Sequence, residues 1–115
     1  MKNQELIDTI KTLQEASKNT EKAIWKAIAK ELDKPKRIRA SVNLSRINRH
    51  TAKDEVVAVP GKVLASGYLD HPLKIAAFSF SETAAQKIKQ AKGETMSLID
   101  LLESGIEPSK IRIMK

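Results

Sequence analysis

The side chains best able to do acid–base or nucleophilic chemistry lie in one stretch, residues 66–71. Ser66, Asp70 and His71 offer a hydroxyl, a carboxylate and an imidazole, the three groups of a hydrolytic triad. Asp70 and His71 are adjacent, however, and no G-x-S-x-G motif places a nucleophile on a strand–turn–helix. We therefore expect no catalysis here, and we expect His71 to be a loop residue that donates a hydrogen bond.

Other motifs of enzyme chemistry are absent or incomplete. The two histidines, His50 and His71, are far apart without supporting ligands, and the chain has no cysteine. The segment PGKVLASG, residues 60–67, lacks the glycine order of a nucleotide-binding or dinucleotide-binding loop. It is either a plain loop between strands or a glycine-lined turn that approaches a phosphate beside Lys62. We expect no enzyme, no metal, no cofactor and no small-molecule substrate.

A basic segment without acidic residues is the strongest functional signal. Residues 34–53 begin KPKRIRASVNLSRINRH and contain no Asp or Glu, although Asp33 and Asp54 flank them. The chain has 21 Lys and Arg, 14 Asp and Glu and a net charge of +7. The segment alone holds seven of the basic residues: Lys34, Lys36, Arg37, Arg39, Arg46, Arg49 and Lys53. A charge excess focused in this way indicates a polyanionic partner.

The other residues of the basic segment indicate that it is an ordered surface. A solvated charge run or a localisation tag would need KPKRIR but would not need the segment VNLSRI, with its apolar residues. Four aliphatic residues can instead anchor the segment in the core: Ile38, Val42, Leu44 and Ile47. Between them lie polar groups suited to sugar hydroxyls and base edges: Asn43, Ser45, Asn48 and Thr51. Aromatic residues make up only 3% of the chain, which speaks against a single-strand stacking platform and favours folded RNA.

We expect the RNA contacts to come from two places. The basic segment would supply Lys34, Lys36, Arg37, Arg39, Asn43, Arg46, Asn48, Arg49, His50 and Lys53. The loop that follows the next strand would supply Lys62, Ser66, Gly67 and His71. The arginine side chains suit bidentate phosphate contacts, and the amides and imidazoles suit added hydrogen bonds.

The elements that must position these residues begin with two helices. Apolar residues at helical spacing predict helices over residues 3–18 and 20–33, with Asn3 and Thr20 as N-terminal caps. Trp25 lies on the second helix and is expected to pack in the core. Pro35 should end that helix, because a residue before proline disfavours the helical conformation. The basic connection, residues 34–53, is expected to be ordered and to contain one helical turn.

Short strands and helices are predicted to alternate over residues 55–115. EVVAVP predicts a strand that stops at the turn Pro60–Gly61, and LKIAAFSF predicts another. Ser79 and Glu82 read as a capping box that opens a helix to about residue 91, stopped by Gly93. ETMS, a helix LIDLLES capped by Ser97, and a final strand IRIM complete the pattern. The expected fold is α/β, a single compact domain with N-terminal helices followed by irregular short strand–helix units.

Length and composition agree with one domain and exclude some locations. The chain has 115 residues, of which 41% are hydrophobic, enough for one modest core. The first residues, MKNQELIDTIKTLQ, mix charged and apolar side chains and do not resemble a signal peptide. No run approaches the roughly 18 apolar residues of a membrane span. We expect a cytoplasmic protein with no membrane partner.

The segment KELDKPKRIRASVNLSRI, residues 30–47, resembles the signature of a ribosomal protein family. This is the archaeal and eukaryotic large-subunit ribosomal protein family "L-eighteen-e". The matching positions are Lys30, Leu32, Pro35, Lys36, Arg39, Ala40, Val42, Asn43, Leu44, Arg46 and Ile47. The later segment VAVPGKVLASGYLDHPLKIAAFSFSETAAQKI also resembles this family, so the resemblance covers essentially the whole chain.

The resemblance implies a structural ribosomal protein of the large subunit, similar in fold to the C-terminal part of bacterial large-subunit ribosomal protein fifteen. It implies binding to large-subunit ribosomal RNA beside neighbouring ribosomal proteins, a role in translation, and no catalysis. The absence of long extensions resembles the archaeal type. One departure is the final segment, SGIEPSKIRIMK, which ends in a lysine-rich tip of no assigned role.

Two alternatives remain open at the level of sequence. A free-standing DNA-binding protein could use the N-terminal helical pair, although its recognition helix, residues 21–33, has nearly balanced charge. A small enzyme could act on a phosphorylated substrate through residues 60–67, but no acid, base or metal group is assembled there.

Overall fold

The aliphatic runs of the second half of the chain form the centre of a parallel β-sheet. The computed structural model describes residues 3–115, which contain one five-stranded sheet with the order β1-β2-β3-β4, and with β5 also paired to β2. All pairings are parallel. The strands are β1 (Ala40–Asn43), β2 (Val56–Leu64), β3 (Lys74–Phe80), β4 (Glu94–Ser97) and β5 (Ile111–Ile113). The expected α/β fold is therefore confirmed.

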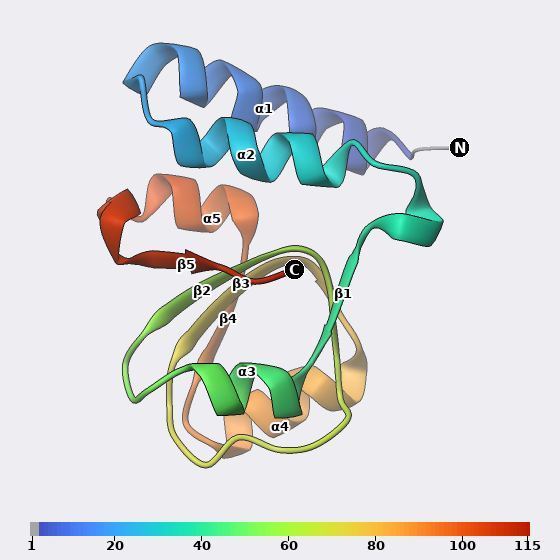
Figure 1. Ribbon diagram of the computed structural model, residues 1–115, viewed down its shortest axis with the longest axis vertical. Helices are drawn as coiled ribbons and strands as arrows, with labels where there is room; N and C mark the ends of the chain where they lie inside the picture. Colours follow the sequence, from blue (N-terminus) through green and yellow to red (C-terminus); the bar gives the residue numbers. More distant parts are fainter. Residues whose placement is uncertain (1–2) are drawn as a thin grey trace.

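Helices cover both faces of the sheet (Figure 1). One face packs against α1 (Gln4–Thr20), α2 (Ala23–Leu32) and α5 (Leu98–Glu103), and the other against α3 (Leu44–His50) and α4 (Glu82–Gln90). Two short 3-10 turns, η1 (Lys36–Ile38) and η2 (Pro108–Lys110), join elements at the periphery. A sheet covered on both faces needs aliphatic strands, and Val57, Val59 and Ile75 are accordingly 0% exposed.

The N-terminal helices form as expected, but the break between them lies further along the chain. The Asn3 side chain accepts a hydrogen bond from the Leu6 backbone N–H, which confirms Asn3 as the cap of α1. Helix α1 continues through Thr20 and stops at Glu21, which has a left-handed φ of 57°. Thr20 is therefore the last residue of α1, and the prediction that it caps α2 is wrong. Trp25 is 3% exposed and packs in the core as expected.

Strand β2 runs through Pro60 and Gly61, where the sequence predicted a turn. The register with β3 shifts between Val59 and Lys62, so the proline lies at an irregularity that does not need its missing N–H. Gly61 faces β1 closely, because a Cβ there would lie 2.0 Å from the Ala40 carbonyl oxygen. Both turn-forming residues are thus used inside a strand, and the glycine permits the close approach of its neighbour.

Helix α4 is correctly placed, but its caps differ from those predicted. Its N-cap is Ser81, whose side chain accepts from the Ala84 N–H, whereas Ser79 still belongs to β3. At the other end the left-handed residue is Lys92, with φ 64°, and the Gly93 N–H donates to the Ile88 carbonyl. By contrast, Ser97 caps α5 as expected, and Asp100 completes a capping box there that was not predicted from the sequence.

The connection from β2 to β3 has no helix. Parallel strands need a connection that returns the chain to the starting edge, and a helix usually provides it. Here residues 65–73, which we call the crossover loop, make this return on the face that carries α3 and α4. Leu69 and Leu73, 8% and 2% exposed, anchor the loop in that core. Its backbone polar groups lack a helix's own hydrogen bonds and need other partners.

Candidate nucleic-acid interface

The basic segment folds as η1, β1 and α3, and residues 51–53 follow outside any helix or strand. Val42, Leu44 and Ile47 are each 0% exposed, so three of the four expected anchors do lie in the core. Ile38 is the exception, because it is 60% exposed on η1. The segment also contains more helix than expected, since Leu44–His50 is a complete short helix.

The basic side chains of the segment divide into those with partners and those without. Lys34 Nζ lies 2.6 Å from the Glu31 carboxylate. Arg39 donates from Nε to the Leu32 carbonyl and from Nη2 to the Lys34 carbonyl, so it satisfies the C-terminal end of α2. Within residues 3–115, the remaining expected cations make no side-chain hydrogen bond or ion pair: Lys36, Arg37, Arg46, Arg49, Lys53 and Lys62.

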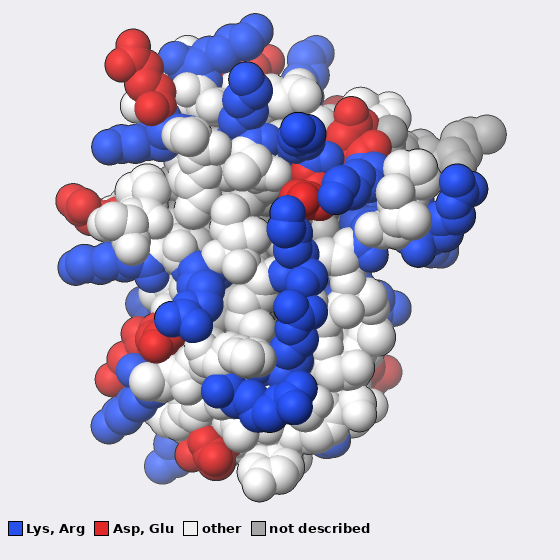
Figure 2. All heavy atoms as spheres, viewed as in Figure 1, with Lys and Arg blue, Asp and Glu red and all other residues white. Residues whose placement is uncertain are grey.

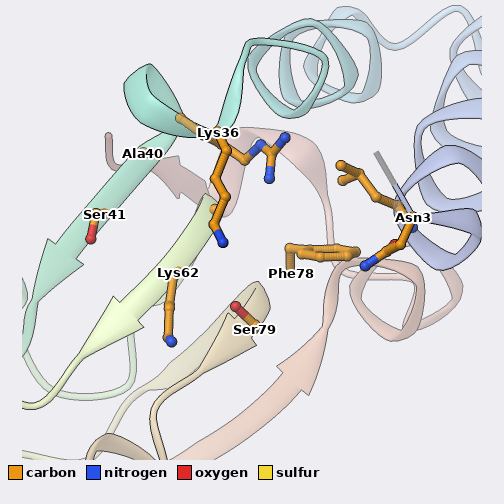
Figure 3. A pocket seen from close by; sticks show the side chains of 10 residues that line it. Asn3, Lys36, Ala40, Ser41, Lys62, Phe78 and Ser79 are labelled. Carbon is orange, nitrogen blue, oxygen red and sulfur yellow. The ribbon is translucent and has the colours of Figure 1, made fainter. Parts of the chain in front are cut away.

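One group of cations surrounds a pocket near the carboxyl ends of the central strands. We call it the η1 pocket; it has a volume of about 400 Å³. Its walls come from η1, β1, β2, β3 and the start of α1: Asn3, Leu6, Lys36, Arg39, Ala40, Ser41, Gly61, Lys62, Phe78 and Ser79. Figure 3 shows the Lys36 and Lys62 side chains on one side of the pocket and Phe78 with Asn3 on the other. The described lining contains three cations and no acid, so the pocket suits an anion.

A second group of basic residues lies on α3, on the other face of the sheet. We define the α3 group as Arg46, Arg49, His50 and the following Lys53, all of which are exposed. Because Leu44 and Ile47 turn towards the core, the intervening positions of this short helix face solvent. Blue side chains gather over α3 in Figure 2, and others stand at the edge over η1. The charge excess predicted from the sequence is thus presented in two separate places.

The expected amide contacts are occupied within the molecule. Asn43 Oδ1 accepts from the Ser66 N–H at 3.2 Å, and Asn48 Oδ1 accepts from the Asp70 N–H at 3.0 Å. The Ser66 carbonyl in turn accepts from the Ser45 N–H. These residues therefore hold the crossover loop against α3 and supply the partners that its backbone needs.

Gly67 and Lys87 complete this support of the crossover loop. Gly67 has φ +89°, and a Cβ there would lie 2.5 Å from the Ser45 Cβ, so glycine is required. Lys87 of α4 donates from Nζ to the Ala65 and Gly67 carbonyls at 2.9 and 2.8 Å. Sequence reasoning missed Lys87, because nothing local shows that α4 and this loop meet.

His71 links the crossover loop to the C-terminal end of α3. Its Nδ1 lies 2.7 Å from Asp70 Oδ1, and its Nε2 lies 2.9 Å from Thr51 Oγ1. Thr51 Oγ1 also donates to the Ile47 carbonyl at 2.7 Å, so the imidazole and this hydroxyl join the crossover loop to the end of α3. The hydrogen bond from His71, followed by that from Asn48, lowers the pKa of Asp70.

Residues 3–115 contain neither a candidate metal site nor a candidate membrane-spanning helix. They contain no group of three or more histidine, aspartate and glutamate side chains close enough to share a metal ion. None of the helices in this described part combines the length and the apolar content needed to cross a membrane.

Fold and surface together define a small basic α/β protein with an acid-free cationic pocket and a second group of exposed basic residues, a class suited to binding nucleic acid. A family model described as "Ribosomal protein 60S L18 and 50S L18e" matches residues 5–108, and the chain belongs to this family. The expectation based on residues 30–47 is therefore confirmed.

Curated relatives are similar over nearly their whole length. Large ribosomal subunit protein eL18 of Methanothermobacter thermautotrophicus is 46% identical over 113 residues, which cover 98% of this chain and 93% of the relative. The protein of the same name from Haloarcula marismortui is 42% identical, with coverage of 98% and 97%. That from Archaeoglobus fulgidus is 43% identical, with coverage of 97% and 96%.

Proposed function

We propose that this protein is a structural constituent of the large ribosomal subunit, where it binds and stabilises folded large-subunit ribosomal RNA during translation. The observation that carries the proposal is the family membership, together with full-length similarity to relatives named large ribosomal subunit protein eL18. Its working location would be the large subunit in the cytoplasm, beside other ribosomal proteins. It acts by binding and not by catalysis.

The mechanism is neutralisation of phosphates by cations held in fixed positions. The η1 pocket would contact one stretch of backbone through Lys36, Lys62 and the part of Arg39 that α2 does not use. The α3 group would contact a second stretch from the other face of the sheet. A small domain with cations on opposite faces can bridge two RNA segments and hold them together.

The expected polar contacts divide into two kinds in this mechanism. Arg37, Arg46, Arg49, His50 and Lys53 are exposed and would touch RNA directly. The remaining expected residues act mainly by shaping the surface, because they hold the crossover loop or the end of α2: Lys34, Asn43, Asn48, Ser66, Gly67 and His71. A DNA-recognition role for α2 has less support, since Trp25, Ile28 and Leu32 are buried under α1 and over the sheet.

The salt dependence of RNA binding tests this mechanism. Each phosphate neutralised adds about 0.7 to 0.9 to the slope of log K against log salt. We expect Arg46→Gln with Arg49→Gln, and separately Lys36→Gln with Lys62→Gln, each to lower that slope by roughly 1.4 to 1.8. The probe is a transcript of large-subunit ribosomal RNA, measured by filter binding over a salt series.

A matched control removes the same charge from another surface. Lys11 and Lys18 are exposed on α1, away from both cationic groups, so Lys11→Gln with Lys18→Gln should leave the slope unchanged. An equal loss of slope in the control would show that binding depends on total charge only. A chain that preferred duplex DNA at equal nucleotide concentration would contradict the proposal itself.

A further inference from the structure

The crossover loop presents one side chain that its supporting hydrogen bonds do not explain. Tyr68 is 66% exposed, the most exposed large apolar side chain among residues 3–115. It is also the only tyrosine of the chain. The other aromatic residues are at least partly buried, since Phe80 packs against the core on this face of the sheet and Trp25 and Phe78 pack on the opposite face.

Hydrogen bonds to the side chains of Asn43, Asn48 and Lys87 hold the backbone on both sides of Tyr68. Before it, the Ala65 and Gly67 carbonyls accept from Lys87, and the Ser66 N–H donates to Asn43. After it, Leu69 is buried and the Asp70 N–H donates to Asn48. The exposed ring is therefore carried by a rigid loop, so that placing it against a ligand costs little conformational entropy.

The surroundings of Tyr68 favour a nucleotide base over an apolar protein surface. The loop's other exposed residues are Ser66, Gly67 and Asp70, and the Asp70 carboxylate is engaged by His71 and Asn48. The other large exposed apolar residues, Ile7 and Ile38, lie on α1 and η1, so no apolar patch surrounds the ring. The cationic α3 group follows directly from Ser45, which touches Gly67.

We propose that Tyr68 stacks on an unpaired base of the RNA whose phosphates the α3 group binds. The inference rests on the proposed function and adds to it a contact with the base, whereas the α3 group contacts only charge. Aromatic stacking accepts any base, because every base has a π-face. The loop thus acts as a fixed support for one ring, and Lys87, Asn43 and Asn48 are positioning residues for it.

Affinity measurements on four proteins test the stacking. Against a large-subunit ribosomal RNA transcript, Tyr68→Ala should weaken binding roughly 5- to 150-fold, the range for loss of one stacked base. Tyr68→Phe keeps the ring and should bind like the wild type. Ile7→Ala removes an exposed apolar side chain from α1 and should change nothing. The salt slope should be the same in all four, because stacking neutralises no phosphate.

A spectroscopic measurement tests the contact without any substitution. Since the chain has one tyrosine, isotope labelling of tyrosine gives a single set of ring signals. We expect these signals to move upfield when the RNA transcript is added, because a stacked base shields the ring. Signals that stay in place at saturating RNA would overturn the inference.

The other outcomes separate this inference from the proposed function. If Tyr68→Ala binds RNA normally while Arg46→Gln with Arg49→Gln does not, the stacking is wrong and the proposed function stands. If Tyr68→Ala binds RNA normally but enters reconstituted large subunits poorly, the ring contacts a protein, and the inference is also wrong. If Tyr68→Phe is as weak as Tyr68→Ala, the hydroxyl and not the ring carries the contact. A wild-type chain that binds no RNA removes both proposals.

Discussion

The two halves of the basic segment, residues 34–39 and 40–50, carry four and two Lys or Arg side chains on very different supports. Residues 34–39 form η1 at the edge of the molecule, where Ile38 is 60% exposed. Residues 40–50 form β1 and α3, where Val42, Leu44 and Ile47 are fully buried. The first half is held mainly by polar contacts of Lys34 and Arg39 at its two ends. The second half is held by its buried aliphatic side chains. The comparison teaches that charge in a sequence says little about how rigidly the charge is presented.

The largest expected effect separates the two halves by their apolar residues. Leu44→Ala should lower the free energy of unfolding by about 2–5 kcal/mol, because it leaves a cavity under α3. Ile38→Ala, its counterpart in the first half, should change that free energy by less than about 0.5 kcal/mol. Urea unfolding followed by circular dichroism measures both. Equal losses of unfolding free energy in the two variants would show that the two halves do not differ in how they are anchored.

Within the second half, neighbouring residues should separate stability from binding. Asn48→Ala loses its hydrogen bonds to Asp70 and should cost about 1 kcal/mol of stability, with a smaller effect on the salt slope of RNA binding. Arg49→Gln, one residue on, should lower the slope by about 0.7 to 0.9 and leave stability unchanged.

Thermal unfolding and filter binding on the same preparations provide the test of this pair. A variant of Arg49 that unfolds earlier, or a variant of Asn48 that loses as much salt slope as Arg49→Gln, would show that the roles are wrongly divided.

Within the first half, Arg39 and Arg37 should differ in the same way. Arg39 satisfies two carbonyls at the end of α2, so Arg39→Ala should cost about 1 kcal/mol of stability. Arg37 has no side-chain partner among residues 3–115, so Arg37→Ala should leave stability within about 0.5 kcal/mol of the wild type. Urea unfolding curves of the two variants test this difference in stability. An Arg37→Ala protein that is as destabilised as Arg39→Ala would contradict the prediction.

The smallest expected effect concerns the ion pairs where the first half joins α2. Hydrogen bonds from Lys115 and then Lys34 lower the pKa of Glu31 below its ordinary value of 4.5. The unfolded chain therefore binds this proton more readily than the folded protein. The stabilisation is complete above about pH 4.5 and is lost as the pH falls through the lower folded pKa.

Glu31→Gln is the matched test of this pH dependence. It removes the titrating group, so the difference in stability between wild type and variant should shrink as the pH is lowered below 4.5. Unfolding measured from pH 6 to about pH 3 follows that difference. A difference that stays constant over this range would show that the ion pairs with Lys34 and Lys115 contribute nothing.

Local sequence signals predicted the elements well where one residue decides the outcome. Asn3 and Ser97 cap their helices as expected, and the aliphatic runs at β2, β3 and β5 are strands. The errors arise where tertiary contacts override a local signal. Pro60 and Gly61 look like a turn, but pairing on both sides of β2 keeps them in the strand.

Prediction of the candidate site from sequence was likewise limited by tertiary contacts. The exposed cations Arg46 and Arg49 could be picked out from charge alone. Asn43 and Asn48 are expected to contact RNA, and their side-chain oxygens also support a crossover loop whose existence depends on the parallel pairing of β2 and β3. That pairing is not encoded in any short pattern. Lys87 supports the same loop and could not have been found without it, and the contact that we propose for Tyr68 depends on that loop as well.

Sedimentation with ribosomes tests the central claim most directly. Purified protein is added to large subunits stripped of their own copy of this protein and is run through sucrose gradients at rising salt. The account predicts that the wild-type chain travels with the large subunit and stays there at salt that releases the protein with Arg46→Gln and Arg49→Gln. A wild-type chain that remains at the top of the gradient, or leaves the subunit at the same salt as this variant, would contradict it.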